Sequence, residues 1–292
     1  MELLVPWSTV PDVVENWQEI YKDLSVALRA HNQFTKEVLT SPTLTKILLA
    51  DARGGNTLLA DARGYATRSE RLPFSLACEY GNIEVVKLLL SDERVNPDAH
   101  GGCAFIEACR HGHLDVIKLL LVPSHERFDE RVNPGACQSL GFLMACDYGH
   151  TEIIKFLLAD ARVDPSSRPL CLINACKRGY LSIVSMLLSD KRVDPSVSNN
   201  TAFILACRNG HTKIARLLLN DSRVDPTSIE DQALLSACHR GHIGIVRMLL
   251  ADGRVDPRSR RYEAVSHARN GGHKEIVQIL SRSVRSRNEA EK

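Results

Sequence analysis

Two short stretches of this 292-residue chain combine thiol and imidazole side chains, which can bind a transition metal. They are Cys109-Arg110-His111-Gly112-His113 and Cys238-His239-Arg240-Gly241-His242. Zinc sites usually draw their ligands from pairs spaced as Cys-x-x-Cys or His-x-x-x-His. Neither stretch contains a pair with that spacing, so the sequence predicts no metal site.

The chain also lacks the patterns on which many hydrolytic and phosphoryl-transfer sites are built. It has no nucleophile elbow, no phosphate-binding glycine loop and no His-Glu-x-x-His motif. We therefore expect no catalytic residues and no cofactor, and we expect that the protein is not an enzyme.

The cysteines follow a period. Six of the nine stand directly after an alanine and three residues before a glycine, which gives them one shared structural position: Cys78, Cys109, Cys146, Cys176, Cys207 and Cys238. Packed helices lie about 8–10 Å apart, whereas a disulfide needs Cα atoms within about 7 Å. We expect these cysteines to be small buried hydrophobic residues that do not bridge.

The alanine before each of these cysteines marks a repeat, and Ala268 ahead of Arg269 marks one more; the last four copies are spaced by 31 residues. Each copy reads as a short apolar segment, a glycine turn, a second apolar segment and a break that is usually Arg-Val-Asp-Pro or Arg-Val-Asn-Pro. In the fifth copy we expect helices over 201–208 and 212–219, joined at Gly210 and ended by Pro226. The seven copies are marked by Ala77, Ala108, Ala145, Ala175, Ala206, Ala237 and Ala268.

This pattern resembles the ankyrin repeat. Most second segments end near Leu-Leu, and Gly-His opens them at Gly112-His113, Gly149-His150, Gly210-His211, Gly241-His242 and Gly272-His273. The resemblance covers about residues 66–285 and implies an all-α ankyrin-repeat solenoid of about seven helix-turn-helix units. The family's Thr-Pro-Leu-His opening is eroded here, for example to Thr201-Ala202-Phe203-Ile204, and the finger loops are about two residues shorter.

Residues 1–43 stand outside the repeat. Asp12 and Glu15 form a capping-box pattern ahead of an apolar helical stripe, so we expect a helical N-terminal cap. A recruitment segment for a second protein is the alternative interpretation.

Two insertions and a tail complete the predicted organisation. Residues 44–65 read as a degenerate half repeat with a duplicated loop, because 48–57 and 58–67 match at eight of ten positions. Residues 122–128 lengthen a second connection, and 286–292 form a charged tail.

The resemblance also suggests where a partner would bind. In ankyrin proteins the finger tips and the two residues before each glycine turn, here called the pre-turn residues, line the contact surface. The candidates are Tyr80, Arg110, His111, Tyr148, Lys177, Arg178, Arg208, His239 and Arg240. Tyrosines would anchor an acidic peptide or protein and the cations would complement its charge, the alternative being an idle solvated face.

We therefore expect a non-catalytic, monomeric scaffold that binds a protein or peptide. A net charge of +2 argues against nucleic acid, and no apolar run is long enough to span a membrane. An odd cysteine count without a secretion signal predicts an intracellular protein, in the cytoplasm rather than the nucleus. The alternative function is an adaptor whose repeats hold a substrate while the N-terminal segment recruits a protein such as ubiquitin-ligase machinery.

Overall fold

The computed structural model describes residues 73–90, 97–121 and 132–290, and every regular element within these ranges is helical. The predicted N-terminal cap, the duplicated loop and the insertion at 122–128 lie outside the described residues. Contacts divide the chain into two compact units, Met1–Cys137 (unit 1) and Gln138–Lys292 (unit 2). Each unit is described separately.

Unit 1 contains two described helix pairs: α4 (Pro73–Glu79), α5 (Ile83–Leu90), α6 (Ala99–His111) and α7 (Leu114–Leu121). The first helices of the pairs, α4 and α6, pack against each other, and so do the second helices, α5 and α7. This is the stacking that the helix-turn-helix repeat predicts.

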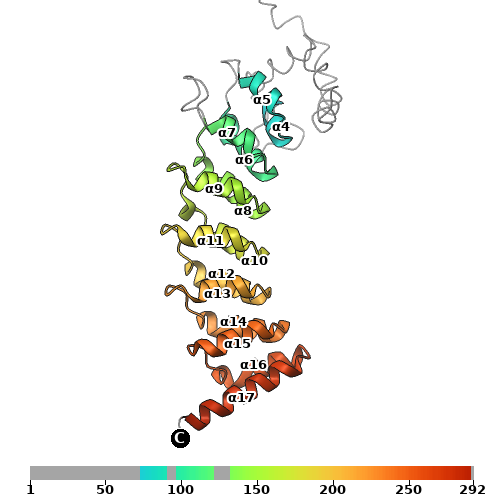
Figure 1. The fold of residues 1–292 in the computed structure, drawn as a ribbon, viewed down its shortest axis with the longest axis vertical. Helices are drawn as coiled ribbons and strands as arrows, with labels where there is room; N and C mark the ends of the chain where they lie inside the picture. The colour runs from blue at the N-terminus through green and yellow to red at the C-terminus, as the bar shows by residue number, and fades with distance from the viewer. Residues whose placement is uncertain (1–72, 91–96, 122–131, 291–292) are drawn as a thin grey trace, which may run out of the picture. The chain divides into compact units, whose positions relative to one another are not determined.

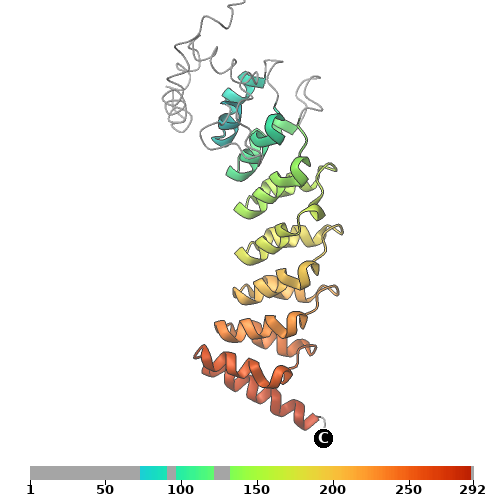
Figure 2. The ribbon, with the colours of Figure 1, turned by 180° about the vertical axis from the view of Figure 1, so that it is seen from behind.

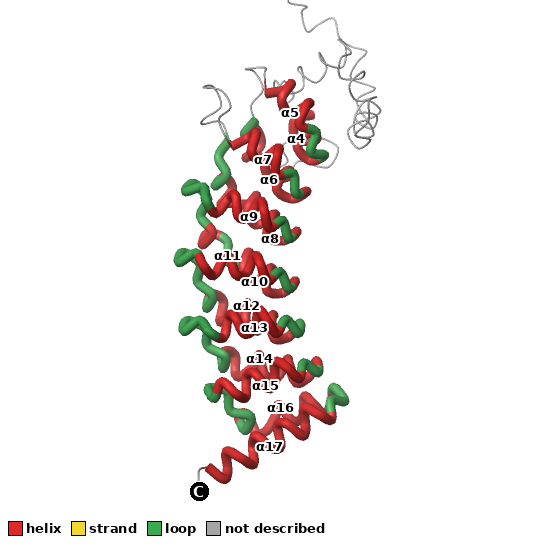
Figure 3. The backbone as a smooth tube through the Cα atoms, in the orientation of Figure 1, coloured by secondary structure: helices red, strands yellow, loops and turns green. Residues whose placement is uncertain are grey.

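Unit 2 continues the same plan. Figures 1 and 2 show its helix pairs from α10 to α17 as successive layers, with each helix packed on its counterpart in the next pair. The loops between pairs lie on one side of this stack and the short turns within pairs on the other (Figure 3). The α-helices, the first of which begins just before the unit boundary, are α8 (Ala136–Tyr148), α9 (Thr151–Leu158), α10 (Leu170–Arg178), α11 (Leu181–Ser189), α12 (Val197–Arg208), α13 (Thr212–Leu219), α14 (Ser228–Arg240), α15 (Ile243–Asp252), α16 (Ser259–Asn270) and α17 (Lys274–Ala290).

The apolar positions of the repeat form the core. Ile214 and Leu218 of α13 are buried, and α13 begins and ends where the sequence predicts. All six cysteines of the shared position are buried free thiols, which confirms their predicted packing role. Burial raises the pKa of each of these thiols, to about 12 for Cys238, and so disfavours the reactive thiolate.

The entries to α12 and α14 are left-handed, which the sequence did not predict. Ser198, Asn199 and Asn200 have φ values of 56°, 56° and 58°, so the right-handed part of α12 begins near the predicted Thr201. The buried Asn200 side chain supports this turn from within. Its Oδ1 accepts a hydrogen bond from the Asp225 backbone N–H (3.1 Å), and its Nδ2 donates to Ser228 Oγ (2.8 Å).

The fourth copy has a proline-containing entry in place of the left-handed turn. Pro169 stands six residues before its alanine, the position that Asn200 holds in the fifth copy. The proline ring cannot adopt a positive φ, and Pro169 has a φ of −54°. The chain here forms instead a 3₁₀ turn, η3 (Pro165–Ser167), ahead of α10.

The last helix is longer than the array predicted from sequence. α17 keeps Ile276 and Leu280 buried, as expected, but runs on past residue 285 to Ala290. Arg287 in this extension donates to the carbonyl oxygens of Gly253 (3.4 Å) and Val255 (2.9 Å). These bonds tie the charged end of the helix to the preceding loop.

Candidate partner-binding surface

The pre-turn residues lie at the C-terminal end of each first helix or directly after it, and the glycine turn that follows positions them. At Gly210 the backbone has a φ of +80°, and an added Cβ would lie 2.7 Å from Cε1 of His242. Only glycine satisfies both the left-handed conformation and this close approach. The turn therefore fixes the direction in which Arg208 leaves the helix.

At four of the described turns, a histidine from the next pair bonds the backbone carbonyl of a residue before the glycine. In unit 2, Nε2 donates from His211 to the Lys177 carbonyl (3.1 Å), from His242 to Arg208 (3.0 Å), and from His273 to His239 (3.0 Å). His113 makes the same bond to Glu79 in unit 1 (2.8 Å). A carbonyl can only accept, so Nε2 carries a proton in each case.

These bonds give a structural role to one histidine of each stretch that resembles a metal site, His113 and His242. Within the described residues, no group of three or more His, Cys, Asp or Glu side chains is placed to hold a metal ion. The fourth copy has Tyr180 in place of the turn histidine. Its ring fills the same space, because a Cβ on Gly149 would lie 2.9 Å from its Cζ.

Six of the nine predicted contact residues belong to unit 2, and all six are exposed: Tyr148, Lys177, Arg178, Arg208, His239 and Arg240. The lysine and the three arginines make no ion pair within the part of the chain that the structure describes. The Tyr148 side chain is 57% exposed and stacks on His150, with ring centroids 6.3 Å apart. Unit 2 thus presents uncompensated cations and an exposed aromatic ring.

The other three candidates, Tyr80, Arg110 and His111, belong to unit 1, where acidic residues accompany them. Arg110 Nη1 donates to both carboxylate oxygens of the buried Glu107, at 3.0 and 3.1 Å. His111 Nε2 lies 3.6 Å from Glu107 and 3.8 Å from Glu79. The sequence signal for this compensation is the i, i+3 spacing of Glu107 and Arg110, which is typical of a helical ion pair.

Asn209 is a pre-turn residue that was not among the candidates for contact. Its Nδ2 donates to the Lys177 carbonyl at 2.9 Å, beside the bond from His211. Two donors from one pair therefore hold the backbone of the preceding turn.

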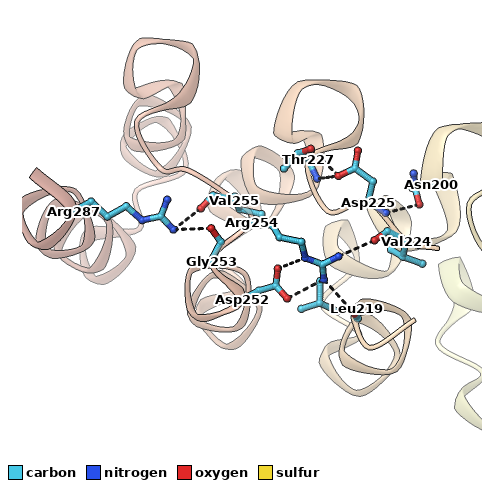
Figure 4. A network of polar contacts seen from close by, with 10 residues as sticks. All are labelled: Asn200, Leu219, Val224, Asp225, Thr227, Asp252, Gly253, Arg254, Val255 and Arg287. Atoms are coloured by element: carbon cyan, nitrogen blue, oxygen red, sulfur yellow. Dashed lines mark hydrogen bonds and ion pairs between the residues drawn. The ribbon is translucent and has the colours of Figure 1, made fainter. Parts of the chain in front are cut away.

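The Asp-x-Arg pairs lie at the end of each second helix or in the loop that follows it, and they link neighbouring copies. Arg223 Nη2 lies 2.7 Å from Asp221, and its Nη1 donates to the carbonyl of Val193 in the preceding loop (2.9 Å). Arg192 reaches Val163 in the same way. Figure 4 shows the next link, in which Arg254 bonds Asp252 and donates to the carbonyls of Val224 and Leu219, both at 3.1 Å.

These hydrogen bonds also lower the pKa of the aspartate carboxylates. The side-chain hydrogen bond from the neighbouring arginine is the main cause that lowers the pKa of Asp160, Asp190, Asp221 and Asp252. The aspartate of each Val-Asp-Pro break caps its own turn, as Asp194 does for Ser196 N–H at 2.9 Å. The charges of these aspartates and arginines are therefore bonded within the scaffold.

A family model for ankyrin repeats in three copies matches residues 40–132 and 142–230, more than half of the chain. The chain belongs to the ankyrin repeat family. Ankyrin repeats are generally protein-interaction modules, and the family is typically non-catalytic.

Among solved structures, a crystal structure of the human ASB11 ankyrin repeat domain is similar, with 19% identity and a TM-score of 0.48. The match covers 66% of this chain and 96% of that one. No curated protein matches the sequence. None of the helices that the structure describes has both the length and the apolar character needed to span a membrane.

Proposed function

We propose that this ankyrin repeat protein is a non-catalytic scaffold that binds an acidic protein segment through the pre-turn residues of unit 2. The observation that carries the proposal is the set of exposed cations without an ion-pair partner within the described residues: Lys177, Arg178, Arg208 and Arg240. An acidic partner would complement this charge and would associate faster because of it.

The fixed backbone of the turns supports this function. The carbonyls of Lys177 and Arg208 are bonded to His211 and His242 of the following pairs, so the side chains start from fixed positions. A surface that is already ordered loses little conformational freedom when a partner binds. More of the contact energy then appears as affinity.

Tyr148 is the proposed apolar anchor. Its exposed ring is a rigid group of the kind enriched where interfaces concentrate binding energy. In unit 1 we assign Arg110 a smaller electrostatic share, because Glu107 already neutralises part of its charge. The carboxylates of Glu107 and Glu79 near His111 likewise reduce its attraction for an acidic partner, and Tyr80 contributes ring surface only.

The loop arginines argue for a protein partner over a nucleic acid. Arg192, Arg223 and Arg254 are exposed in part, but each is bonded to an aspartate and a backbone carbonyl. Nucleic-acid binding requires many cations that are available to neutralise phosphates. These arginines therefore do not extend the basic surface of the pre-turn residues to the size that a nucleic acid needs.

A pull-down of the full chain against the triple variant Lys177→Gln, Arg178→Gln and Arg208→Gln tests the proposal, with bound proteins identified by mass spectrometry. A triple variant at Lys155, Lys191 and Lys274, which are exposed cations elsewhere in unit 2, is the matched control. We expect partners that the first variant loses and the control retains, with binding that weakens as salt rises. Identical partner lists for all three proteins would reject the proposal.

A further inference from the structure

Three of the second helices share a charge pattern that the later ones lose. The second position of the helix is acidic and the fifth basic in α5, α7 and α9. In unit 1 these residues pair, with 3.2 Å between Lys87 and Glu84 and 3.9 Å between Lys118 and Asp115. The cations of α5 and α7 are therefore neutralised within their own helices.

Ser182, Lys213 and Gly244 occupy the acidic position in α11, α13 and α15. Arg247 at the fifth position of α15 still finds a carboxylate, because Glu275 of α17 lies 3.1 Å away. The residue that stands to Arg216 of α13 as Glu275 stands to Arg247 is residue 244, which is a glycine and offers no carboxylate. Arg216 and Lys213 are exposed and have no ion-pair partner in the described chain.

A groove of about 910 Å³ lies where this pattern is lost, between α11 and α13. Serines at 182 and 185 leave room that longer charged side chains occupy in α5, α7 and α9. Leu181 and Leu217 give the groove apolar surface, and the Leu181 residue is 38% exposed. We name this feature the second-helix groove.

We propose that the second-helix groove binds an acidic peptide segment that carries an aliphatic side chain. Carboxylates of the segment pair with Lys213 and Arg216, and its aliphatic group covers Leu181 and Leu217. The groove lies on the second helices and shares no residue with the pre-turn surface, so this binding is separate from the proposed function.

Gly244→Glu tests the groove by supplying the missing acid. A Cβ at residue 244 would meet only the Thr212 side chain, at ordinary distances of 3.6 and 3.8 Å, so a side chain fits there. In the register of Glu275 and Arg247, the new carboxylate would neutralise Arg216. Gly244→Gln is the matched control, since it adds the same bulk without the charge.

The probes are peptides selected from a random twelve-residue display library on the full chain, after depletion on the Gly244→Glu protein. We expect sequences rich in Asp and Glu with a Leu, Ile or Val, whose affinity at low salt falls at least about tenfold in Gly244→Glu. Affinity should be unchanged in Gly244→Gln. It should also be unchanged in the triple variant at Lys177, Arg178 and Arg208, which reports only on the pre-turn surface.

Three outcomes overturn the inference. The first is that no acidic peptide is recovered, or that both variants at residue 244 bind the peptides equally. The second is a dimer in sedimentation that dissociates in Gly244→Glu, because the occupant would then be a second copy of the chain. The third is a single-stranded oligonucleotide that binds the original protein and Gly244→Gln but not Gly244→Glu.

Discussion

His242 shows how one side chain serves two neighbouring helix pairs. Its ring occupies the space that the missing Cβ of Gly210 leaves open, and its Nε2 donates to the Arg208 carbonyl. The residue thus contributes packing and a hydrogen bond to a turn that also presents a candidate binding residue.

We expect His242→Ala to lower the free energy of unfolding by about 1–3 kcal/mol, since it removes both contributions. His242→Tyr should lose less, because Tyr180 already fills the equivalent space beside Gly149. Urea unfolding followed by circular dichroism measures both values. Equal losses would show that ring packing contributes nothing at this turn.

Asp231 is a second residue whose burial and hydrogen bonding lead us to expect a change in stability on mutation. It stands where Asn200 stands one copy earlier and is only 7% exposed, and its Oδ1 is buried without a hydrogen-bond partner in the structure. Its φ of 62° also lies in the left-handed region, which asparagine tolerates well.

We expect Asp231→Asn to raise the free energy of unfolding by about 1–2 kcal/mol, because it removes a buried charge and supplies an amide that can donate. Asn200→Asp should lower it by a similar amount by breaking the bond to Ser228. Thermal and urea unfolding of the two variants check the pair. A destabilised Asp231→Asn protein would contradict the interpretation.

At the scale of elements, the loops between helix pairs predict a dependence of stability on pH. Hydrogen bonds from arginine lower the pKa of Asp190, Asp221 and Asp252 in the folded protein. A lowered folded pKa adds stability that is fully present above the unfolded value of about 3.9 and is lost as the pH falls through the folded pKa.

Stability should therefore decline steeply below about pH 4, and Arg223→Gln should make that decline shallower. We expect the variant to lose at most about 1 kcal/mol at neutral pH, since the arginine is partly exposed. Urea unfolding measured at a series of pH values tests this. Arg216→Gln is the control, because Arg216 has no carboxylate partner in the described chain and the pH profile should not change.

Elements also show what the sequence could predict. Apolar periodicity and glycine turns placed α13 correctly, because these signals are local. The left-handed entries escaped prediction, because Ser198 and Ile229 have no intrinsic preference for positive φ. At Asn200 the support comes from Asp225 and Ser228 of the next copy, and single-residue propensities do not contain that contact.

The candidate surface was predictable in part. The glycine turn identified the pre-turn residues from the family pattern, and those of unit 2 are exposed. Their different environments were not foreseen, because they depend on contacts such as the ion pair of Arg110 with Glu107 and the hydrogen bond that Asn209 Nδ2 donates to the Lys177 carbonyl. The partner and the binding face remain predictions.

At the scale of the whole molecule, a stack in which pairs contact only their neighbours should lose stability locally. Leu187 of α11 is fully buried, and Leu187→Ala should cost about 2–5 kcal/mol. Within unit 2 we expect amide-exchange protection to fall most in α9, α11 and α13 and least in α17. Exchange followed by mass spectrometry maps the change, and a uniform loss across unit 2 would contradict the nearest-neighbour behaviour.

The hydrogen bonds of the loop arginines in unit 2 all run in the same direction along the chain. Arg192, Arg223 and Arg254 each donate to the loop before their own, so each copy brings a donor and leaves an acceptor for the next. Gene duplication or deletion of a whole copy among these repeats would therefore leave every such valine carbonyl with an arginine donor. Arg287 makes the equivalent bond to the Val255 carbonyl, but from helix α17 in place of a loop.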